Sequence, residues 1–379
     1  MFISHILLEN YRNYTSLDIK LSNDVNVFYG NNGQGKTNLL ESIFFTVIGK
    51  SFRGTKDIDI INYGKDHFNI EIDISDDITE NIAIKYNKNK EKYIKVNGLY
   101  LRKTGHLMGN VIAVIFSPED MQLISEGPSV RRKFLDIAIS QVKPTYYFDL
   151  LQYNKILFQK NTLLKNIKYG KCKEDNAFLT VWNEQLSDIG AKIIYERNKI
   201  INDLSVIASE KHLKIAEKSA EKDELFKIFY STDISREILA ENNVEKYKEE
   251  LFILLESKAK KEIEREMTLS GPHRDDIDFK LDDKDMKKFS SQGQKRTAIL
   301  SLKLAELELL KKVTGRKPIF LLDDVFSELD DKRQEAFLRE INGVQTFISC
   351  VNIDSLKCDG KKLIPFEIKN GGVVEKTFL

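Results

Sequence analysis

A glycine-rich stretch near the N-terminus has the residue types and the spacing of a phosphate-binding loop. Residues 30–37 follow the pattern Gly-x-x-x-x-Gly-Lys-Thr. Glycines let backbone N–H groups turn toward an anion, and a helix that begins at the loop adds a favourable partial charge. The lysine reaches the β- and γ-phosphates, and the threonine hydroxyl is a ligand for Mg²⁺. ATP with Mg²⁺ is the expected ligand, bound by Gly30, Asn31, Asn32, Gly33, Gln34, Gly35, Lys36 and Thr37.

The segments on either side of this loop are the strand and the helix that such a site needs. Residues 25–29 have the composition of a strand. After the loop, Leu40, Ile43 and Val47 recur at helical spacing, and Gly49 is a typical helix stop. The alternative is a chance match in a glycine-rich turn, and that alternative does not predict a strand before the loop and a helix after it.

Two adjacent carboxylates end a second apolar segment at residues 318–324, Pro-Ile-Phe-Leu-Leu-Asp-Asp. A buried parallel strand delivers its last side chains at the carboxyl edge of the sheet, where ligands bind. Asp323 is expected to hold Mg²⁺, directly or through water, and Asp324 to polarise an attacking water. An exposed strand end with two acids is the alternative. Because the chain also has a phosphate loop, we favour a single phosphoryl-transfer site formed by the loop and the two acids. Its catalytic residues would be Asp324 and Lys36.

A third polar motif, Ser-Gln-Gly-Gln at residues 291–294, stands at the predicted start of a helix. Such a start offers N–H groups to an anion. Because the chain already has one phosphate loop, a second anion site suits a γ-phosphate presented by another molecule. This arrangement implies two nucleotides held between two protomers, with contacts from Ser291, Gly293 and Gln294. A plain helix N-cap, which contributes about 1 kcal/mol to helix stability, is the alternative.

The segments that must position these motifs predict an α/β protein with an inserted helical domain. Strand patterns fill the first 29 residues, and Phe68, Ile70, Ile72 and Ile74 alternate cleanly beside the nucleotide core, as in an antiparallel sheet. Between about residues 120 and 266, glycine and proline are sparse, and apolar residues recur at intervals of three and four residues. This pattern indicates long antiparallel helices. We expect an ATPase head from residues 1–119 and 268–379, and a helical arm from residues 120–267.

Composition narrows the class of protein. The 379 residues carry a net charge of +1, with 41% hydrophobic and 31% charged residues, so any nucleic-acid surface must be a local patch. Three cysteines without zinc spacing favour a reducing, intracellular setting. No apolar run approaches the roughly 20 residues that span a bilayer, and no signal peptide is evident at the N-terminus. A cytoplasmic location is expected.

Together, these motifs resemble the ABC-type ATPases of the SMC class and, more closely, the RecF family of bacterial recombination mediators. The motifs span nearly the whole chain in the order found in the family. They are the phosphate loop, Glu-Asn-Tyr-Arg-Asn-Tyr at 9–14, Ser-Pro-Glu-Asp at 117–120, Gly-Pro-His-Arg-Asp-Asp at 271–276, Ser-Gln-Gly-Gln-Lys-Arg at 291–296, and Leu-Leu-Asp-Asp-Val-Phe-Ser-Glu-Leu-Asp at 321–330.

The resemblance implies an ABC-type P-loop ATPase head, with a mixed parallel core sheet and an antiparallel sheet, and a short helical arm in place of a long coiled coil. It implies an ATP-dependent homodimer, weak DNA-stimulated ATP hydrolysis, and binding to duplex DNA and to single-strand gaps and junctions. The implied partners are RecR and RecO, with RecA loading, DNA repair, replication, recombination and the SOS response as the setting.

The resemblance also implies that Ser291 acts in trans and that Arg12 approaches the nucleotide. One departure concerns the γ-phosphate sensor. ABC transporters place a histidine after the strand that here ends at residues 348–351, and this chain has none. The family implies a small polar residue there, which leaves the sensor unassigned.

No base-reading motif is present, so DNA is expected to be bound through its backbone, with strong salt dependence. The candidate contacts are basic residues in exposed-looking segments. Solvated helix faces are the alternative for each cluster. The candidates are Lys50, Arg53, Lys56, Arg131 and Arg132, with further clusters at residues 168–173 and 258–261.

Two other functions fit parts of the pattern. A monomeric P-loop kinase or NTPase would share the loop and the acids, but the motif at residues 291–294 and the helical arm argue against it. A structural tether of the SMC type would place its function in long coiled-coil arms, and the arm predicted here is too short. The state of the protein in solution separates these possibilities.

Overall fold

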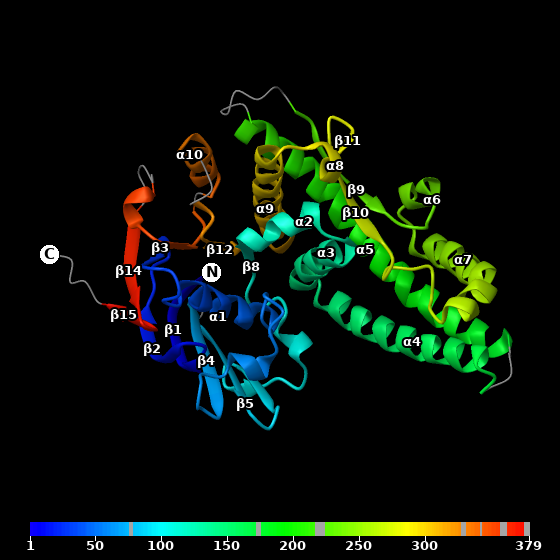
Figure 1. The fold of residues 1–379 in the computed structure, drawn as a ribbon, viewed down its shortest axis with the longest axis horizontal. Coiled ribbons are helices and arrows are strands. Elements are labelled where there is room, and N and C mark those ends of the chain that lie inside the picture. The colour runs from blue at the N-terminus through cyan, green and yellow to red at the C-terminus, as the bar shows by residue number, and fades with distance from the viewer. Residues whose placement is uncertain are drawn as a thin grey trace. The chain divides into compact units, whose positions relative to one another are not determined.

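The computed structural model describes residues 1–75, 79–171, 176–216, 224–326, 331–341, 343–356 and 362–374 (Figure 1). The chain divides into two compact units. The first, which we call the head unit, holds residues 1–122, 207–225 and 291–379, and the second, the arm unit, holds residues 123–206 and 226–290. No helix among the described residues is long and apolar enough to cross a membrane.

A six-stranded sheet forms the centre of the head unit, in the order β15-β14-β3-β13-β12-β8. All neighbouring strands are parallel except β14 and β15. Three of the strands are buried along their whole length, which explains their continuous apolar runs. The strands are β3 (Val25–Tyr29), β8 (Ala113–Phe116), β12 (Ile319–Asp323), β13 (Thr346–Cys350), β14 (Leu363–Lys369) and β15 (Gly372–Val374).

A second six-stranded sheet of the head unit is antiparallel, in the order β2-β1-β4-β5-β6-β7. On β4, Phe68, Ile70, Ile72 and Ile74 are buried and their neighbours are not, as the alternating sequence predicted. The strands are β1 (Phe2–Tyr11), β2 (Tyr14–Lys20), β4 (His67–Ser75), β5 (Glu80–Asn87), β6 (Lys92–Val96) and β7 (Leu99–Tyr100). The prediction of parallel and antiparallel sheets is therefore confirmed.

Helix α1 (Lys36–Ile48) contacts strands of both sheets, among them β12 and β13 of the parallel sheet and β4 of the antiparallel one. It is buried on nearly all sides because both sheets cover it, and its buried residues include the polar Glu41, Ser42 and Thr46. Gly49 ends it with φ of 69°, as predicted. Among the described residues, the head unit also contains the helices η1 (Asp57–Ile60), η2 (Thr104–Leu107), η3 (Pro118–Met121), α9 (Gln292–Thr314), α10 (Asp331–Glu340) and η6 (Ile353–Ser355).

Helices dominate the arm unit. A buried ion pair joins α4 to α7, where Lys160 Nζ lies 2.6 Å from Glu262 Oε2. The elements are α2 (Gln122–Ser125), α3 (Pro128–Val142), α4 (Pro144–Lys168), α5 (Asn176–Ala216), α6 (Arg236–Ala240), α7 (Val244–Arg265), α8 (Met286–Phe289), and the strands β9 (Phe226–Ser231), β10 (Asp276–Leu281) and β11 (Lys284–Asp285).

The two units divide the chain differently from the predicted boundaries. Residues 268–290 group with the arm unit, because β10 pairs antiparallel with β9 to make a three-stranded sheet there. The end of α5 groups with the head unit, where Lys211 Nζ lies 2.5 Å from Glu308 Oε2 and 2.7 Å from Glu340 Oε2. Both differences arise from contacts between segments far apart in the sequence.

Candidate functional site

The phosphate loop has a backbone that only glycine accommodates at two positions. Gly30 and Gly35 have φ of 142° and 115°, outside the range that other residues favour. A Cβ atom on Gly30 would lie 2.5 Å from the Ile368 carbonyl oxygen, and one on Gly35 would lie 2.5 Å from Asn13 Nδ2. These glycines are therefore required by conformation and by packing together, at the point where β3 leads into α1.

The turn at residues 12–14 holds the loop from outside. The Asn13 side-chain amide donates to the Gln34 carbonyl at 2.8 Å, and the Tyr14 hydroxyl donates to the Gly35 carbonyl at 3.0 Å. From the other side, the backbone N–H of Asn370 donates to Gln34 Oε1 at 2.6 Å. In the sequence, this turn appeared only as part of the motif at residues 9–14. Its supporting role could not be predicted without knowing that the turn between β1 and β2 lies beside the phosphate loop.

Lys36 lies across the loop rather than away from it. Its Nζ donates to the carbonyl oxygens of Gly30 at 2.6 Å and Asn31 at 2.9 Å. Burial lowers the pKa of Lys36, and the nearby Asp324 and Asp323 carboxylates oppose that shift. If a phosphate bound in the loop, the Lys36 ammonium could donate to its charged oxygens in place of the two neutral carbonyl oxygens. Hydrogen bonds to a charged acceptor are stronger, and the ammonium already lies beside the loop.

Thr37 and Asp323 meet, as the two motifs predicted. The Thr37 hydroxyl donates to Asp323 Oδ1 at 2.8 Å, and the Ser349 hydroxyl donates to the same oxygen at 2.7 Å. Burial raises the pKa of Asp323, while these two hydrogen bonds lower it. Ser349 is a site residue that the sequence analysis missed. Its only signal is a hydroxyl near the end of an otherwise apolar strand, at the same sheet edge as the two acids.

The donor set around Asp323 fits Mg²⁺. Hydroxyl and carboxylate oxygens are the ligands that this cation prefers, and it usually takes one or two from the protein and the rest from phosphates and water. Among the described residues, no group of three or more histidine, cysteine or acidic side chains could hold a metal by itself. Thr37 and Asp323 would supply the protein ligands, and a bound nucleotide and water would supply the others.

Asp324 has a left-handed backbone, with φ of 51°. Its N–H donates to the Ser349 hydroxyl at 2.9 Å, so one serine side chain contacts both acids. The structure also brings three sequence motifs together beside Asp324. They line one small pocket, formed by Phe116, Ser117, Pro118, Met121, Arg296, Leu300, Asp324 and Val325.

Arg12 contacts helix α1 through Glu41. Its Nε and Nη2 donate to the two carboxylate oxygens of Glu41, both at 2.8 Å, and Nη2 also donates to Thr55 Oγ1 at 3.0 Å. Burial opposes the charge, but the hydrogen bonds and charge of the buried Glu41 raise the pKa of Arg12 overall. Arg12 therefore braces α1, and its predicted approach to a nucleotide stays a prediction.

The motif at residues 291–294 forms the first turn of α9. The Ser291 hydroxyl accepts from the Gln294 N–H at 3.2 Å, and Gln294 Oε1 accepts from the Ser291 N–H at 2.8 Å, which is a capping box. The Gln294 side-chain amide donates to Glu224 Oε1 at 2.6 Å. A Cβ atom on Gly293 would meet nothing closer than 3.9 Å. Packing within the chain therefore does not require a glycine there.

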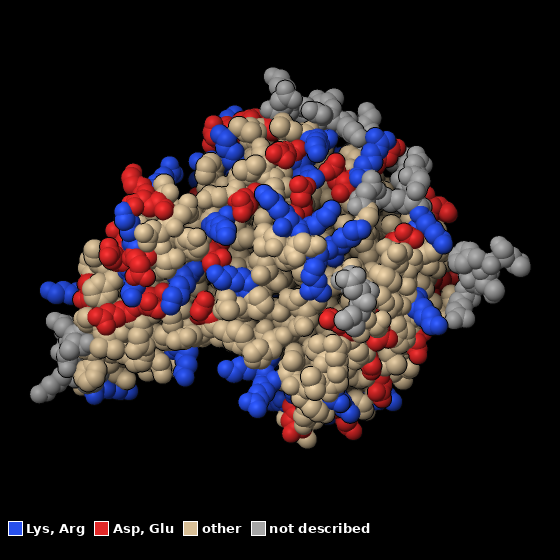
Figure 2. Space-filling model, turned by 180° about the vertical axis from the view of Figure 1, so that it is seen from behind, with Lys and Arg blue, Asp and Glu red and all other residues tan. Residues whose placement is uncertain are grey.

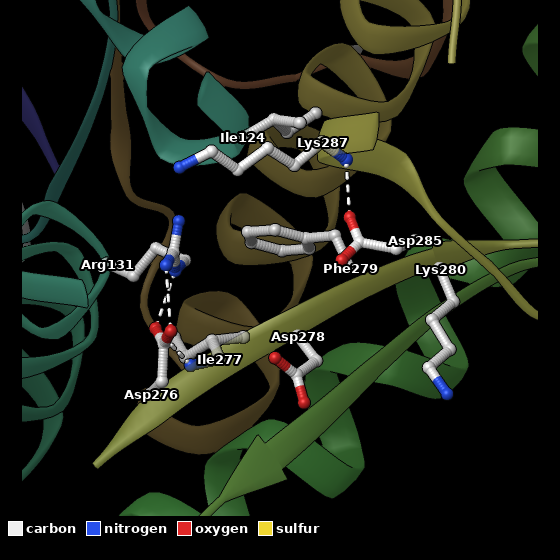
Figure 3. Close-up of a pocket in the computed structure, with 9 residues that line it drawn as sticks. All are labelled: Ile124, Arg131, Asp276, Ile277, Asp278, Phe279, Lys280, Asp285 and Lys287. Carbon is white, nitrogen blue, oxygen red and sulfur yellow. Dashed lines mark hydrogen bonds and ion pairs between the residues drawn. The ribbon is translucent and has the colours of Figure 1, made fainter. Parts of the chain in front are cut away.

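The predicted DNA contacts divide into two groups. Lys50, Arg53 and Lys56 are exposed on the segment after α1. Arg131 is a correction, because its buried guanidinium is held by both oxygens of Asp276, at 2.6 and 2.8 Å (Figure 3). Arg132 is half-buried and donates to the Asp275 carbonyl at 2.7 Å. The Arg131 guanidinium, held in this way, is not an exposed phosphate contact, whereas Arg132 stays a predicted contact.

Charge on the surface is mixed. Figure 2 shows Lys and Arg side chains interspersed with Asp and Glu over the face drawn, rather than one continuous basic field. This agrees with the net charge of +1. The residues at 327–330, which complete the motif after Asp324, lie outside the described residues, as does Lys173 of the cluster at 168–173.

Comparisons with known proteins cover nearly the whole chain. A family model described as an AAA domain matches residues 5–345. The DNA replication and repair protein RecF of Acetivibrio thermocellus is 44% identical over 353 residues, which are 93% of this chain and 94% of that protein. RecF of Ruminiclostridium cellulolyticum is 42% identical over 354 residues, 93% of each chain.

Solved structures give the same result. The recombination mediator protein RecF of the RecFOR pathway, solved as RecF-ATP, is 38% identical, with a TM-score of 0.89 over 98% of this chain and 97% of that one. An SMC head bound to a domain of ScpA is 14% identical, with a TM-score of 0.55, and it shares the fold. The chain therefore belongs to the RecF family of DNA replication and repair proteins.

Proposed function

We propose that this chain binds ATP and Mg²⁺, and that ATP closes a head-to-head homodimer on DNA at gaps and junctions. Slow hydrolysis, which DNA stimulates, opens the dimer again. The support for the nucleotide site is a complete phosphate loop with its two acids, and a relative solved with ATP. The support for the dimer is the motif at residues 291–294, which we call the signature motif. Its side chains are hydrogen-bonded within the chain, and there is space beside Gly293.

In the nucleotide site, the loop N–H groups and Lys36 bind the phosphates. Lys36 then exchanges the carbonyls of Gly30 and Asn31 for phosphate oxygens. Thr37 and Asp323 would hold Mg²⁺, which when bound neutralises charge on the phosphates. Asp324 polarises the attacking water. Ser349 fixes the carboxylate of Asp323 and the backbone of Asp324 through two hydrogen bonds.

The signature motif binds the γ-phosphate of the nucleotide held by the other protomer. In the capping box, the Ser291 oxygen accepts a bond from Gln294, so its own proton can be donated to a phosphate. The first N–H groups of a helix also lack partners inside the helix. A phosphate can approach the backbone at Gly293 because no side chain is there, and because the chain leaves space around it.

DNA lies against a basic surface to which Lys50, Arg53 and Lys56 contribute. We expect the chain to act with RecR and RecO in repair and replication, and to promote RecA loading and SOS induction. The support for these partners is membership of the RecF family and the RecFOR pathway named for its solved relatives. Binding through the DNA backbone predicts an affinity that falls steeply with salt.

The test is the mass in solution by light scattering, with and without Mg-ATP, in the presence and absence of DNA. The monomer of 43.8 kDa is expected to become a dimer when ATP is present. Ser291→Arg should bind ATP and remain a monomer, because the bulk and charge block the motif that contacts the second nucleotide. A normal Ser291→Arg dimer contradicts the trans role. A wild-type monomer under all four conditions favours a monomeric NTPase.

A further inference from the structure

One basic stretch of the head unit takes no part in the ATPase site. Residues 85–103 hold seven Lys or Arg residues and one acidic residue, in a chain whose net charge is only +1. Ion pairs within the chain hold Lys88, which lies 2.8 Å from Asp66, and Lys92, which lies 2.5 Å from Asp57. The stretch covers β5, β6, β7 and the residues that follow β7.

Lysine and tyrosine alternate on the outer face of these three strands. Lys85 of β5 stands opposite Tyr93 of β6, and Lys95 of β6 stands opposite Tyr100 of β7. Tyr93 and Lys95 are two residues apart on one strand, so they share a face. Ile94 between them is buried on the other face. Two rings and two ammonium groups therefore alternate across the strands.

Both rings are open to solvent. Tyr93 is 43% exposed and Tyr100 is 65% exposed. Their centroids lie 6.4 Å apart, and Lys95 Nζ lies 4.6 Å from the centroid of the Tyr100 ring. The opposite face already supplies the packing of this part of the sheet, with Ile82, Ile84 and Ile94 buried. The two rings add cross-strand contacts on the outer face, but the hydrophobic core does not require them there.

Protection of a sheet edge is the simpler explanation, and it covers only part of the pattern. Lysine on an edge strand such as β7 and its neighbour prevents pairing with other chains. Exposed apolar surface does the reverse, and Leu99 on β7 is 74% exposed in addition to the two tyrosines. Edge protection therefore does not explain the exposed rings. Together with their basic neighbours, they favour a negatively charged polymer that has flat rings of its own.

We propose that the outer face of β5, β6 and β7 binds single-stranded nucleic acid, with the lysines on phosphates and the two tyrosines stacked on unpaired bases. Rings interleaved with positive charge are the usual platform for single strands. Bases within a duplex are stacked on each other, so this face distinguishes single strands from duplex. The proposal rests on the proposed DNA binding and locates the single-stranded side of a gap on this sheet.

The test uses the full chain with ATP and a fluorescent 20-nucleotide oligo(dT), followed by anisotropy. Loss of two stacking rings in Tyr93→Ala/Tyr100→Ala should weaken binding about tenfold or more. Affinity for a duplex of the same length should not change. The matched control is Tyr63→Ala, which removes a fully exposed ring elsewhere in the head unit (101% exposed) and should bind as the wild type does.

A second pair of variants tests the charges. Lys85→Gln/Lys95→Gln should reduce the slope of log K against log salt by about 1.4, because each phosphate contact on a single strand contributes about 0.7. Lys20→Gln, on β2 at the opposite edge of the same sheet, is the control and should leave the slope unchanged. Oligo(U) in place of oligo(dT) shows whether DNA or RNA is preferred by the same surface.

Several results would overturn the proposal. Unchanged oligo(dT) affinity in the tyrosine variant is one, and an equal loss for single strands and duplex is another, since it indicates charge alone. Intact nucleic-acid binding with loss of a protein partner would make this face a protein interface. If the wild type binds neither gapped nor single-stranded DNA, the proposed function itself fails before any variant is compared.

Discussion

The phosphate loop and the signature motif differ in where their side chains find partners. Lys36 is buried against its own loop, and Thr37 bonds to Asp323, 286 residues away. Ser291 and Gln294 bond mainly to each other at an exposed helix start. A site braced from distant segments is complete within one chain. A site satisfied by its immediate neighbours has its remaining N–H groups available to something brought from outside.

The largest effect is expected from Asp324→Asn in the braced site. Hydrolysis of ATP should fall by about 10²- to 10⁴-fold, because a carboxylate that polarises water is replaced by an amide. ATP affinity should stay within a few-fold, since Asn tolerates the left-handed backbone found here, with φ of 51°. Phosphate release measures the first effect and calorimetry the second. Asp354→Asn, an exposed acid in η6, is the control, and normal hydrolysis by Asp324→Asn refutes its assigned role.

Lys36→Ala should weaken ATP binding by about 100-fold, the effect of losing a hydrogen-bonded charge in a partly buried site. Two bonds to loop carbonyls are lost as well, so the loop itself loses an internal brace. Fluorescence of a labelled ATP measures the affinity. Lys50→Ala, an exposed lysine shortly after α1, is the control for charge and should bind ATP normally. Equal affinities in the two variants would place the phosphates elsewhere.

Two helical glycines extend the comparison, because one is packed tightly within the chain and the other has space around it. A Cβ on Gly190 in α5 would lie 2.7 Å from Leu251 Cδ2, whereas one on Gly293 would meet nothing closer than 3.9 Å. Gly190→Ala should therefore lower the free energy of unfolding by about 1–3 kcal/mol through overpacking. Gly293→Ala should raise it by up to about 1 kcal/mol, because alanine favours a helix.

The same Gly293→Ala variant should weaken the ATP-dependent dimer about tenfold, because the added methyl group stands where the second nucleotide approaches. Thermal unfolding and light scattering give the two readings on one protein. A more stable monomer together with a weaker dimer would indicate that the glycine makes room for a ligand outside its own chain. A dimer of wild-type strength would mean that Gly293 has no such ligand.

Sequence reasoning reached the parts of the site that are written as short patterns. The loop, the two acids and the start of α9 are each contiguous, and the alternation on β4 gives its buried face directly. It failed where the partner is remote. Arg131 stands in a basic run, and nothing local indicates that Asp276, 145 residues later, occupies its guanidinium.

The unit boundaries were missed for a related reason. The pattern between residues 120 and 266 is helical, but β9 near its end pairs with β10 beyond it, and the last turns of α5 are tied to α9 and α10 by Lys211. Strand pairing and ion pairs between distant segments leave little trace in local composition. Ser349 belongs to the same class, since it contacts both acids only because β13 lies beside β12.

Ser349→Ala should have the smallest effect, about five- to tenfold on kcat/KM, from the loss of two buried hydrogen bonds. Its direction with pH is the sharper reading. Burial raises the pKa of Asp323, and the Ser349 hydroxyl opposes that shift by stabilising the carboxylate. Without the hydroxyl the pKa of Asp323 rises further, and only the ionised form can hold a cation. The acid limb of the kcat/KM profile should therefore move to higher pH. Ser349→Thr keeps a hydroxyl and should restore the wild-type limb. An acid limb that does not move in Ser349→Ala would mean that the serine only fills space between β12 and β13.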